Sequence, residues 1–361
     1  MPVNHRGARA LLIGAALVVV IAGLKAASEI LAPTMMAAFL AILCVPPMRR
    51  LQSRGVPEWL ALIIVAGVAA LIVFLIGVVI GGSIDSFQRE LPKYSKRIAE
   101  LTGGLSTWLD GMGVDLGTEG LADNLNPEKL MGFVGDTLGR VISALSNTIL
   151  VILTIIFILL EVNGMSRKIR TIMGGPEADL SEFSRGTQQV QTYLAVKTIV
   201  SLATGALVAI LCFAVGVDFA MLWALLAFLF NFVPNIGSII AAVPAVLLTL
   251  VQYGPGHMAI VAIGYFAINM VIGNAVEPKM LGRRLGLSTL VVFLSMVFWY
   301  FVWGPIGMLL SVPMTVIVKI LLEHTEDFAW VAVLLGSGAE AEEALERQTA
   351  ASRRAAESAA E

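Results

Sequence analysis

Three short segments in the second half of the chain decide its fold. They are Phe-Val-Pro-Asn-Ile-Gly at 232–237, Asn-Ala-Val-Glu-Pro-Lys-Met-Leu-Gly-Arg-Arg-Leu-Gly-Leu-Ser at 274–288 and Trp-Gly-Pro-Ile-Gly at 303–307. They interrupt apolar sequence that is otherwise suited to a bilayer. A helix that only anchored the chain would have no use for such breaks, because they free backbone groups that hydrocarbon cannot satisfy. Transporters build their binding sites from helices interrupted in this way.

The composition is that of a polytopic membrane protein. The 361 residues are 58% hydrophobic and 14% charged, whereas soluble domains carry about 25% charged residues. The net charge of −2 indicates no class of partner, and the two cysteines lie in apolar runs, so no disulfide framework is predicted. The sequence has neither a Gly-x-x-x-x-Gly-Lys-Ser/Thr loop nor a Gly-x-Ser-x-Gly elbow, so we predict no enzyme. No cofactor or metal site is predicted either, because the three histidines form no pair at ligand spacing.

Apolar runs near the roughly 20 residues that cross a bilayer predict an all-α fold with about eight transmembrane helices or hairpins. Two apolar regions, 219–252 and 287–322, are too long for single spans. Each has a Pro/Gly break near its centre, so each is predicted to be a broken helical hairpin. The other apolar runs lie at about 10–26, 28–47, 57–82, 141–162, 192–216 and 257–277.

Four regions follow one another along the chain. They are N-terminal transmembrane helices at 1–82, an extramembrane amphipathic helical segment at 83–140, a transmembrane core with both hairpins at 141–323, and a cytoplasmic tail at 324–361. Basic loop residues mark the cytoplasmic side, which predicts that both termini are cytoplasmic. The basic residues behind this orientation are Arg6, Arg9, Arg49, Arg50, Arg54, Arg167, Lys168, Arg170, Arg185, Lys279, Arg283 and Arg284.

An apolar seam runs through the extramembrane segment with the alternating steps of four and three that helices use to pack on each other. We interpret it as a contact between subunits of a homo-oligomer. The alternative is an amphipathic helix that lies on the bilayer or on its own subunit. The seam consists of Phe87, Leu91, Tyr94, Ile98, Leu101, Leu105 and Trp108.

Glu277 is the best candidate for an ion or proton site, because ionisable residues near membrane depth are functional suspects by default. It ends a long apolar span, precedes Pro278 and follows Asn274 by three residues, which predicts that both share one helical face. The alternative is an interfacial acid that pairs with Lys279, Arg283 or Arg284. Two weaker candidates are Glu161, which could instead be an interfacial charge, and Asp218, which could simply cap the first hairpin.

Asn231 and Asn235 flank Pro234 at the first break, where their amides could hydrogen-bond a polar solute. Alternatively, they satisfy backbone groups that Pro234 leaves free. The two hairpins also resemble each other, since Phe232 to Pro244 and Phe301 to Pro313 share a pattern of Pro, Ile-Gly and Val-Pro. The similarity fits paired broken helices around one site, although apolar, Pro/Gly-rich sequences also match by chance.

These segments resemble the signature of the autoinducer-2 exporter (AI-2E) family of bacterial permease-like proteins. The resemblance is carried by Phe-Asn-Phe-Val-Pro-Asn-Ile-Gly-Ser-Ile-Ile-Ala-Ala-Val-Pro-Ala-Val at 230–246, by 274–288, and by Trp-Gly-Pro-Ile-Gly-Met-Leu-Leu-Ser-Val-Pro-Met-Thr at 303–315. It extends over residues 10–323 and implies a homo-oligomeric inner-membrane protein. Family members are associated with export of autoinducer-2, some are assigned sodium/proton antiport, and many have no assigned substrate.

We therefore expect a secondary transporter or facilitator that exports a small polar solute such as autoinducer-2. Its partners would be the solute, protons or sodium, the lipid bilayer and further copies of the chain, with no nucleic acid. The alternatives are a sodium (or lithium)/proton antiporter and a non-transporting membrane scaffold that acts through the seam. The predicted pathway residues are Asn231, Pro234, Asn235, Gly237, Asn274, Glu277, Gly304 and Gly307.

Overall fold

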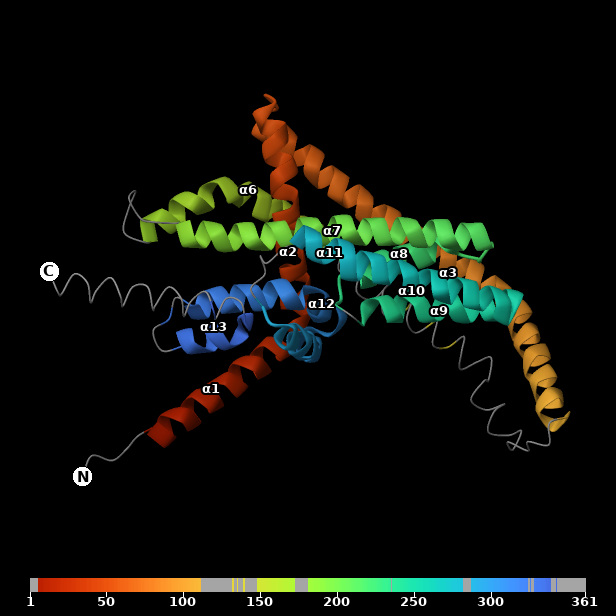
Figure 1. Cartoon of the computed structure of the whole chain (residues 1–361). Coiled ribbons are helices and arrows are strands. Elements are labelled where there is room, and N and C mark those ends of the chain that lie inside the picture. Colours follow the sequence, from red (N-terminus) through yellow and green to blue (C-terminus); the bar gives the residue numbers. More distant parts are fainter. Residues whose placement is uncertain are drawn as a thin grey trace. The chain divides into compact units, whose positions relative to one another are not determined.

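The fold consists of helices throughout the part of the chain that the structure describes. A computed structural model describes residues 6–111, 132, 135, 139, 148–172, 181–234, 236–281, 287–323, 325, 328–338 and 342. The first helices are α1 (Arg6–Ala26), α2 (Ser28–Ser53), α3 (Glu58–Gly111), α6 (Thr148–Ile172) and α7 (Ser181–Val215). The later ones are α8 (Ala220–Phe230), α9 (Gly237–Tyr253), α10 (Pro255–Val271), the π-helix η1 (Ile272–Val276), α11 (Glu277–Leu281), α12 (Thr289–Glu323) and α13 (Ala329–Leu335) (Figure 1). The all-α prediction is confirmed.

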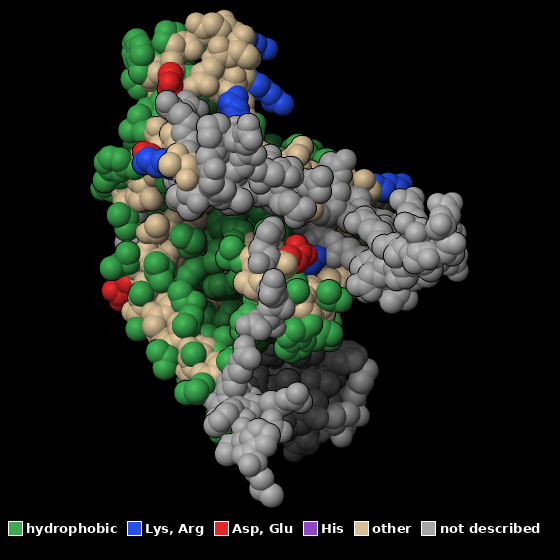
Figure 2. Space-filling model, turned by 90° about the vertical axis from the view of Figure 1, so that its left-hand side faces the viewer, with side chains coloured by type: hydrophobic (Ala, Val, Ile, Leu, Met, Phe, Trp, Pro, Cys, Tyr) green, Lys and Arg blue, Asp and Glu red, His purple; other side chains and the backbone are tan. Residues whose placement is uncertain are grey.

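Many of these helices are long and apolar enough to cross a membrane. Five such stretches are Ser28–Ser53, Glu58–Glu100, Thr187–Val215, Pro255–Met280 and Thr289–Glu323, and four shorter apolar helices accompany them. Large apolar side chains remain exposed on them, among them Phe74 and Ile210, and Figure 2 shows hydrophobic side chains spread over much of the surface. An exposed apolar surface of this extent needs the lipid tails of a bilayer to cover it. The prediction of a multi-pass membrane protein is confirmed.

The chain folds into two compact units, each assembled from separate stretches of sequence. One unit comprises Met1–Phe39, Val162–Ala195 and Leu281–Glu361, and the other comprises Leu40–Glu161 and Val196–Met280. The first break, at 231–237, belongs to the second of these units, which also holds α8, α9, α10 and η1. The second break, at 303–307, belongs to the first unit. The four consecutive regions expected from the sequence describe membrane boundaries and stay a prediction.

The region 219–252 forms the predicted hairpin, made of α8 and α9. Its two ends meet, because the Asp218 backbone N–H donates to Gln252 Oε1 at 3.2 Å and the Tyr253 hydroxyl donates to the Gly216 carbonyl at 2.8 Å. With 11 residues, α8 is only about 17 Å long. A hydrocarbon core is about 30 Å thick, so α8 reaches only part of the way across.

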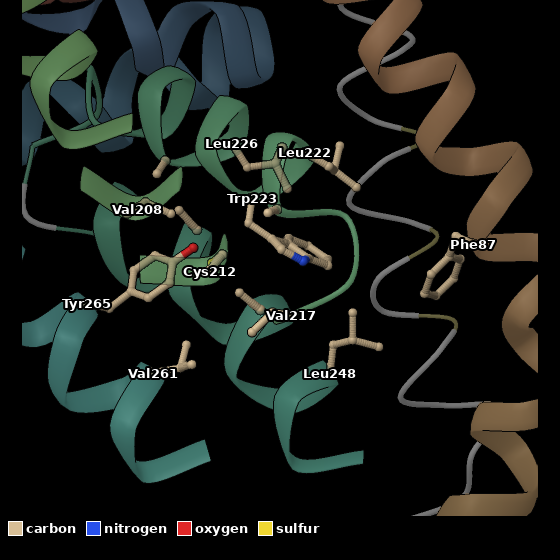
Figure 3. Packing of buried hydrophobic residues seen from close by; sticks show 14 of the residues in the cluster. Phe87, Val208, Cys212, Val217, Leu222, Trp223, Leu226, Leu248, Val261 and Tyr265 are labelled. Atoms are coloured by element: carbon tan, nitrogen blue, oxygen red, sulfur yellow. The ribbon is translucent and has the colours of Figure 1, made fainter. Parts of the chain in front are cut away.

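A buried apolar core holds this hairpin against α3, α7 and α10. Figure 3 shows Trp223 and Leu226 of α8 near Val208 and Cys212 of α7, with Phe87 of α3 on the opposite side. Trp223 is fully buried, and its indole N–H donates to the Asp218 carbonyl at 2.7 Å. Since an unpaired buried N–H would be costly, this bond fixes where the loop enters α8.

The helix α3 continues without interruption from the third predicted span into the extramembrane segment. Over 54 residues it extends about 80 Å, well beyond one bilayer. The seam residues Phe87, Tyr94 and Ile98 are buried within their own subunit, and Leu91 packs on the same core. These positions therefore pack on their own subunit. A contact between subunits through the seam stays a prediction. The side chains of Leu101, Leu105 and Trp108 lie outside the described residues.

The region 287–322 also forms a hairpin, although its two halves are continuous in α12. The backbone leaves helical geometry at Trp303 (φ −127°, ψ 17°) and Gly304 (φ 60°, ψ −144°). The Trp299 indole N–H donates to the Thr315 hydroxyl at 3.1 Å, across 16 residues. A straight helix would separate them by about 24 Å, so the chain turns back. The Ser288 N–H donates to the Leu335 carbonyl at 3.2 Å, which attaches α13 to the start of α12.

Candidate functional site

An ion pair joins two predicted membrane spans in the unit that contains the first break. The Lys197 ammonium of α7 donates to Glu277 Oε1 at 2.5 Å. The Lys197 side chain is 4% exposed and that of Glu277 is 18% exposed. Both residues lie within stretches apolar and long enough to cross a bilayer, Thr187–Val215 and Pro255–Met280. Ionisable residues at such depth are expensive and usually functional.

A π-helix places Glu277 beside Lys197. The five residues of η1 end at Val276, and Glu277 begins α11 immediately before Pro278. Proline has no N–H and cannot continue the ordinary hydrogen-bond ladder, which is one cause of irregular turns in helices. Such π-bulges occur frequently at functional sites. Pro278 is therefore a local cause of the break in the helix, and the break determines where the Glu277 carboxylate lies.

A stripe of buried polar side chains continues from Lys197 along α7. Ser201 is fully buried and Thr204 is 2% exposed. Their spacing of four and three residues puts them on one face of the helix, with neighbouring Cβ atoms about 5–6 Å apart. The Asn231 amide N–H, at the end of α8, donates to the Ser201 hydroxyl at 3.0 Å. The stripe thus brings the first break and the ion pair to the same face of α7.

At the first break, the chain turns tightly between α8 and α9. Asn231 and Pro234 are half-buried in this turn, while Asn235 lies outside the described residues. A Cβ on Gly237 would overlap the Phe230 carbonyl oxygen, so only glycine fits where α9 begins. Asn231 therefore bonds to a neighbouring helix, whereas Gly237 has a structural role at the turn.

The second break, in the other unit, also depends on glycines at a tight turn. Gly304 has φ +60°, a conformation that favours glycine, and a Cβ on Gly307 would overlap the Trp299 carbonyl oxygen. The surroundings are aromatic, since the rings of Trp299 and Trp303 pack with centroids 5.0 Å apart and a tilt of 40°. The Trp303 indole N–H donates to the Leu24 carbonyl of α1 at 3.1 Å. Gly304 and Gly307 thus shape a turn that aromatic side chains surround.

Two other predicted site residues, Asn274 and Glu161, are not turned toward the ion pair. Asn274 is exposed although Glu277 is turned inward. The shared face expected from three-residue spacing assumed an α-helix, and η1 has the wider i→i+5 turn. Glu161 is exposed in α6.

Asp218 belongs to a separate polar cluster near the start of α8. Its carboxylate accepts a hydrogen bond from the Tyr94 hydroxyl at 2.8 Å. It does not cap α8, whose N-cap residue is Phe219 without a side-chain cap bond. Phe219 adopts φ 60°, which is unusual for a non-glycine residue, and its ring meets that of Phe87 edge-on at 5.9 Å. Asp218 thus ties α3 to the hairpin.

Sequence reasoning missed Lys197, the partner of Glu277. The interfacial alternative paired Glu277 with Lys279, Arg283 or Arg284, all close to it in the chain, and Arg283 and Arg284 lie outside the described residues. The signal was present, because Lys197 stands inside the apolar run 192–216 and Ser201 and Thr204 follow at helical spacing. A lysine that begins a polar stripe in an otherwise apolar span is as informative as the acidic residue it meets.

The helical fold, with its long apolar stretches and broken hairpins, defines a polytopic membrane protein. The family model described as AI-2E family transporter matches residues 15–327. The chain belongs to this family. It is 38% identical over 319 residues to the "AI-2 transport protein TqsA" of Escherichia coli strain K12, which covers 88% of this chain and 93% of that protein.

Two further relatives are similar over nearly their whole length. A "Putative transport protein" of Haemophilus influenzae is 41% identical over 336 residues, covering 91% of this chain and 96% of the relative. The "Putative transport protein YhhT" of Escherichia coli strain K12 is 36% identical over 335 residues, covering 93% and 96%. The region that the family model matches, residues 15–327, includes both breaks and the Lys197–Glu277 pair. The predicted family is confirmed.

Proposed function

We propose that this protein exports a small polar solute such as autoinducer-2 across the bacterial inner membrane. The observation that carries the proposal is the buried Lys197–Glu277 pair, which continues into the polar stripe of α7. A buried ion pair is weak evidence for stability, because desolvation offsets the attraction between its charges. Its place between two spans of a transport protein instead favours a role in binding the cargo.

The pathway in this proposal runs along α7 beside the first break. Lys197, Ser201 and Asn231 would hydrogen-bond the solute, while Glu277 would take a proton or a cation. The broken hairpin of α8 and α9 lets polar groups reach this depth without a full crossing. In this proposal both termini are cytoplasmic, and the transporter works as a homo-oligomer.

The test is flux of autoinducer-2 in vesicles that contain the purified full-length chain under imposed proton and sodium gradients. Glu277→Gln and Lys197→Met are expected to lower the flux by about tenfold or more, since each removes a charge from the pathway. The matched control is Lys279→Gln, which neutralises an exposed residue close to Glu277. If Glu277→Gln retained full flux and its pH dependence, Glu277 would be a structural residue.

Sodium/proton antiport is the second candidate, favoured by a carboxylate that is both intramembrane and partly exposed. It predicts that sodium jumps move protons in the same vesicles without any organic solute. The scaffold alternative needs an accessible seam, yet Phe87, Tyr94 and Ile98 are covered by their own subunit. Disrupting the seam while sparing Glu277 separates that alternative from transport.

A further inference from the structure

The two charges of the ion pair differ in how deeply they are buried. The Lys197 side chain is 4% exposed, whereas the Glu277 side chain is 18% exposed. Glu277 also lies at the junction between η1 and α11, next to the exposed Lys279. A swing of the Glu277 side chain would therefore move its carboxylate away from Lys197 and toward the surface, while Lys197 would stay buried.

A buried ammonium cannot stay without a counter-charge at acceptable cost, because an unpaired charge in a low-dielectric interior is strongly unfavourable. Once Glu277 leaves, the Lys197 ammonium either loses its proton or pairs with another anion, and only an anion keeps the ammonium charged. Exchange of one carboxylate for another keeps the charge of the buried site constant. Among the described residues, the structure gives Lys197 no second acidic partner.

Within the described part of the chain, Lys197 donates to Glu277, which leaves further N–H donors for such an anion. An ammonium has three N–H donors, and one of those on Lys197 is used by Glu277. Ser201, one helical turn further, receives a hydrogen bond from Asn231 and keeps its own O–H. Because the Cβ atoms of residues four apart on a helix are about 5–6 Å apart, one solute with two oxygen groups can reach both positions.

We propose that Glu277 occupies the place of a solute carboxylate, so that the site carries small hydroxycarboxylates whose carboxylate binds Lys197 and whose hydroxyl binds Ser201 and Asn231. The inference rests on the proposed transport function and names a cargo class for the same site. The solute displaces Glu277 when it binds, and the return of Glu277 to Lys197 releases the solute. Glu277 therefore weakens binding and speeds release.

The test uses 3-hydroxybutyrate and its neutral amide, 3-hydroxybutyramide, with the full-length chain. Binding is measured in detergent by calorimetry, and exchange by counterflow of labelled 3-hydroxybutyrate in vesicles, with protein-free vesicles as the background. The acid is expected to bind and exchange, and the amide is not. Glu277→Gln should tighten binding of the acid by about tenfold, a modest change for removal of one competitor, while it slows counterflow. Lys197→Met should abolish both, and Lys197→Arg should retain binding because it keeps the charge.

The double variant Lys197→Met/Glu277→Gln guards against misfolding, because it removes both charges and leaves neither buried alone. It should be folded and fail to bind the acid. Equal binding of acid and amide, or acid binding by a folded Lys197→Met protein, would overturn the inference. If autoinducer-2 moves but the acid neither binds nor exchanges, the proposed export stands and the inference fails. If the acid binds and exchanges while autoinducer-2 does not move, the inference holds for hydroxycarboxylates and the proposed export of autoinducer-2 fails.

Discussion

The two breaks use the same backbone device for different chemistry. In both, a glycine after the turn contacts the carbonyl at the end of the preceding helix, Gly237 against Phe230 and Gly307 against Trp299. The first break lies beside polar partners, since Asn231 bonds to Ser201 of α7. The second is surrounded by Trp299, Trp303 and the end of α1. A shared turn therefore does not imply a shared role, and the side chains around it decide what it can bind.

Substituting the two contact glycines should destabilise the protein and should affect both breaks alike. Gly237→Ala and Gly307→Ala each force the backbone to shift, because the added Cβ would meet a carbonyl rather than a flexible side chain. Overpacking costs about 1–3 kcal/mol and occasionally more. The melting temperature in detergent should fall for both. Gly256→Ala is the control, since nothing lies within 4 Å of its Cβ position. If only one of the two glycine variants kept the normal melting temperature, the two turns would not be equivalent.

The two charges of the ion pair beside the first break should differ in how much stability is lost when each is removed. Glu277→Leu leaves Lys197 buried and unpaired, which typically costs about 3–5 kcal/mol. Lys197→Met should cost less, because Glu277, at 18% exposed, is less completely buried than Lys197. The measurement is a double-mutant cycle on unfolding in detergent, with the double variant Lys197→Met/Glu277→Leu closing it. Equal costs for the two single variants would contradict the asymmetry.

Removing one hydrogen bond at each break should show which break contributes to transport and which contributes only to stability. Asn231→Ala removes the bond to Ser201 and should lower solute flux several-fold, with a stability loss of about 1 kcal/mol. Thr315→Val removes the bond from Trp299 in the aromatic break and should cost similar stability while leaving the half-saturating solute concentration unchanged. A flux defect confined to Thr315→Val would reverse the roles assigned to the breaks.

The smallest effect is expected at the edge of the first hairpin. Tyr94→Phe removes the hydrogen bond to Asp218 but keeps the buried ring. A single hydrogen bond contributes about 0.5–1.5 kcal/mol, so the melting temperature should fall slightly. Protection from hydrogen exchange around residues 216–220 reports the same change locally. Unaltered protection there would mean that α3 does not hold the hairpin.

Local sequence features predicted the helical spans and their breaks well, because both depend on residues that are close together in the chain. Apolar runs of sufficient length predicted the spans, and Pro and Gly predicted the hairpin turns at Pro234 and Gly304. Asn274 and Glu277 were placed on one face because α-helical spacing was assumed. The π-helix overturned that detail, because its wider turn separates the faces of Asn274 and Glu277.

The sequence by itself determined the family, the membrane-embedded helical class and the positions where helices break. Tertiary structure alone decided the partners: Lys197 for Glu277 across 80 residues, Tyr94 for Asp218 across 124 residues, and the subunit's own core for the first part of the seam. The physical reason is range. Helix periodicity and turn chemistry act within a few residues, whereas the choice of a buried charge's partner depends on which helices pack together.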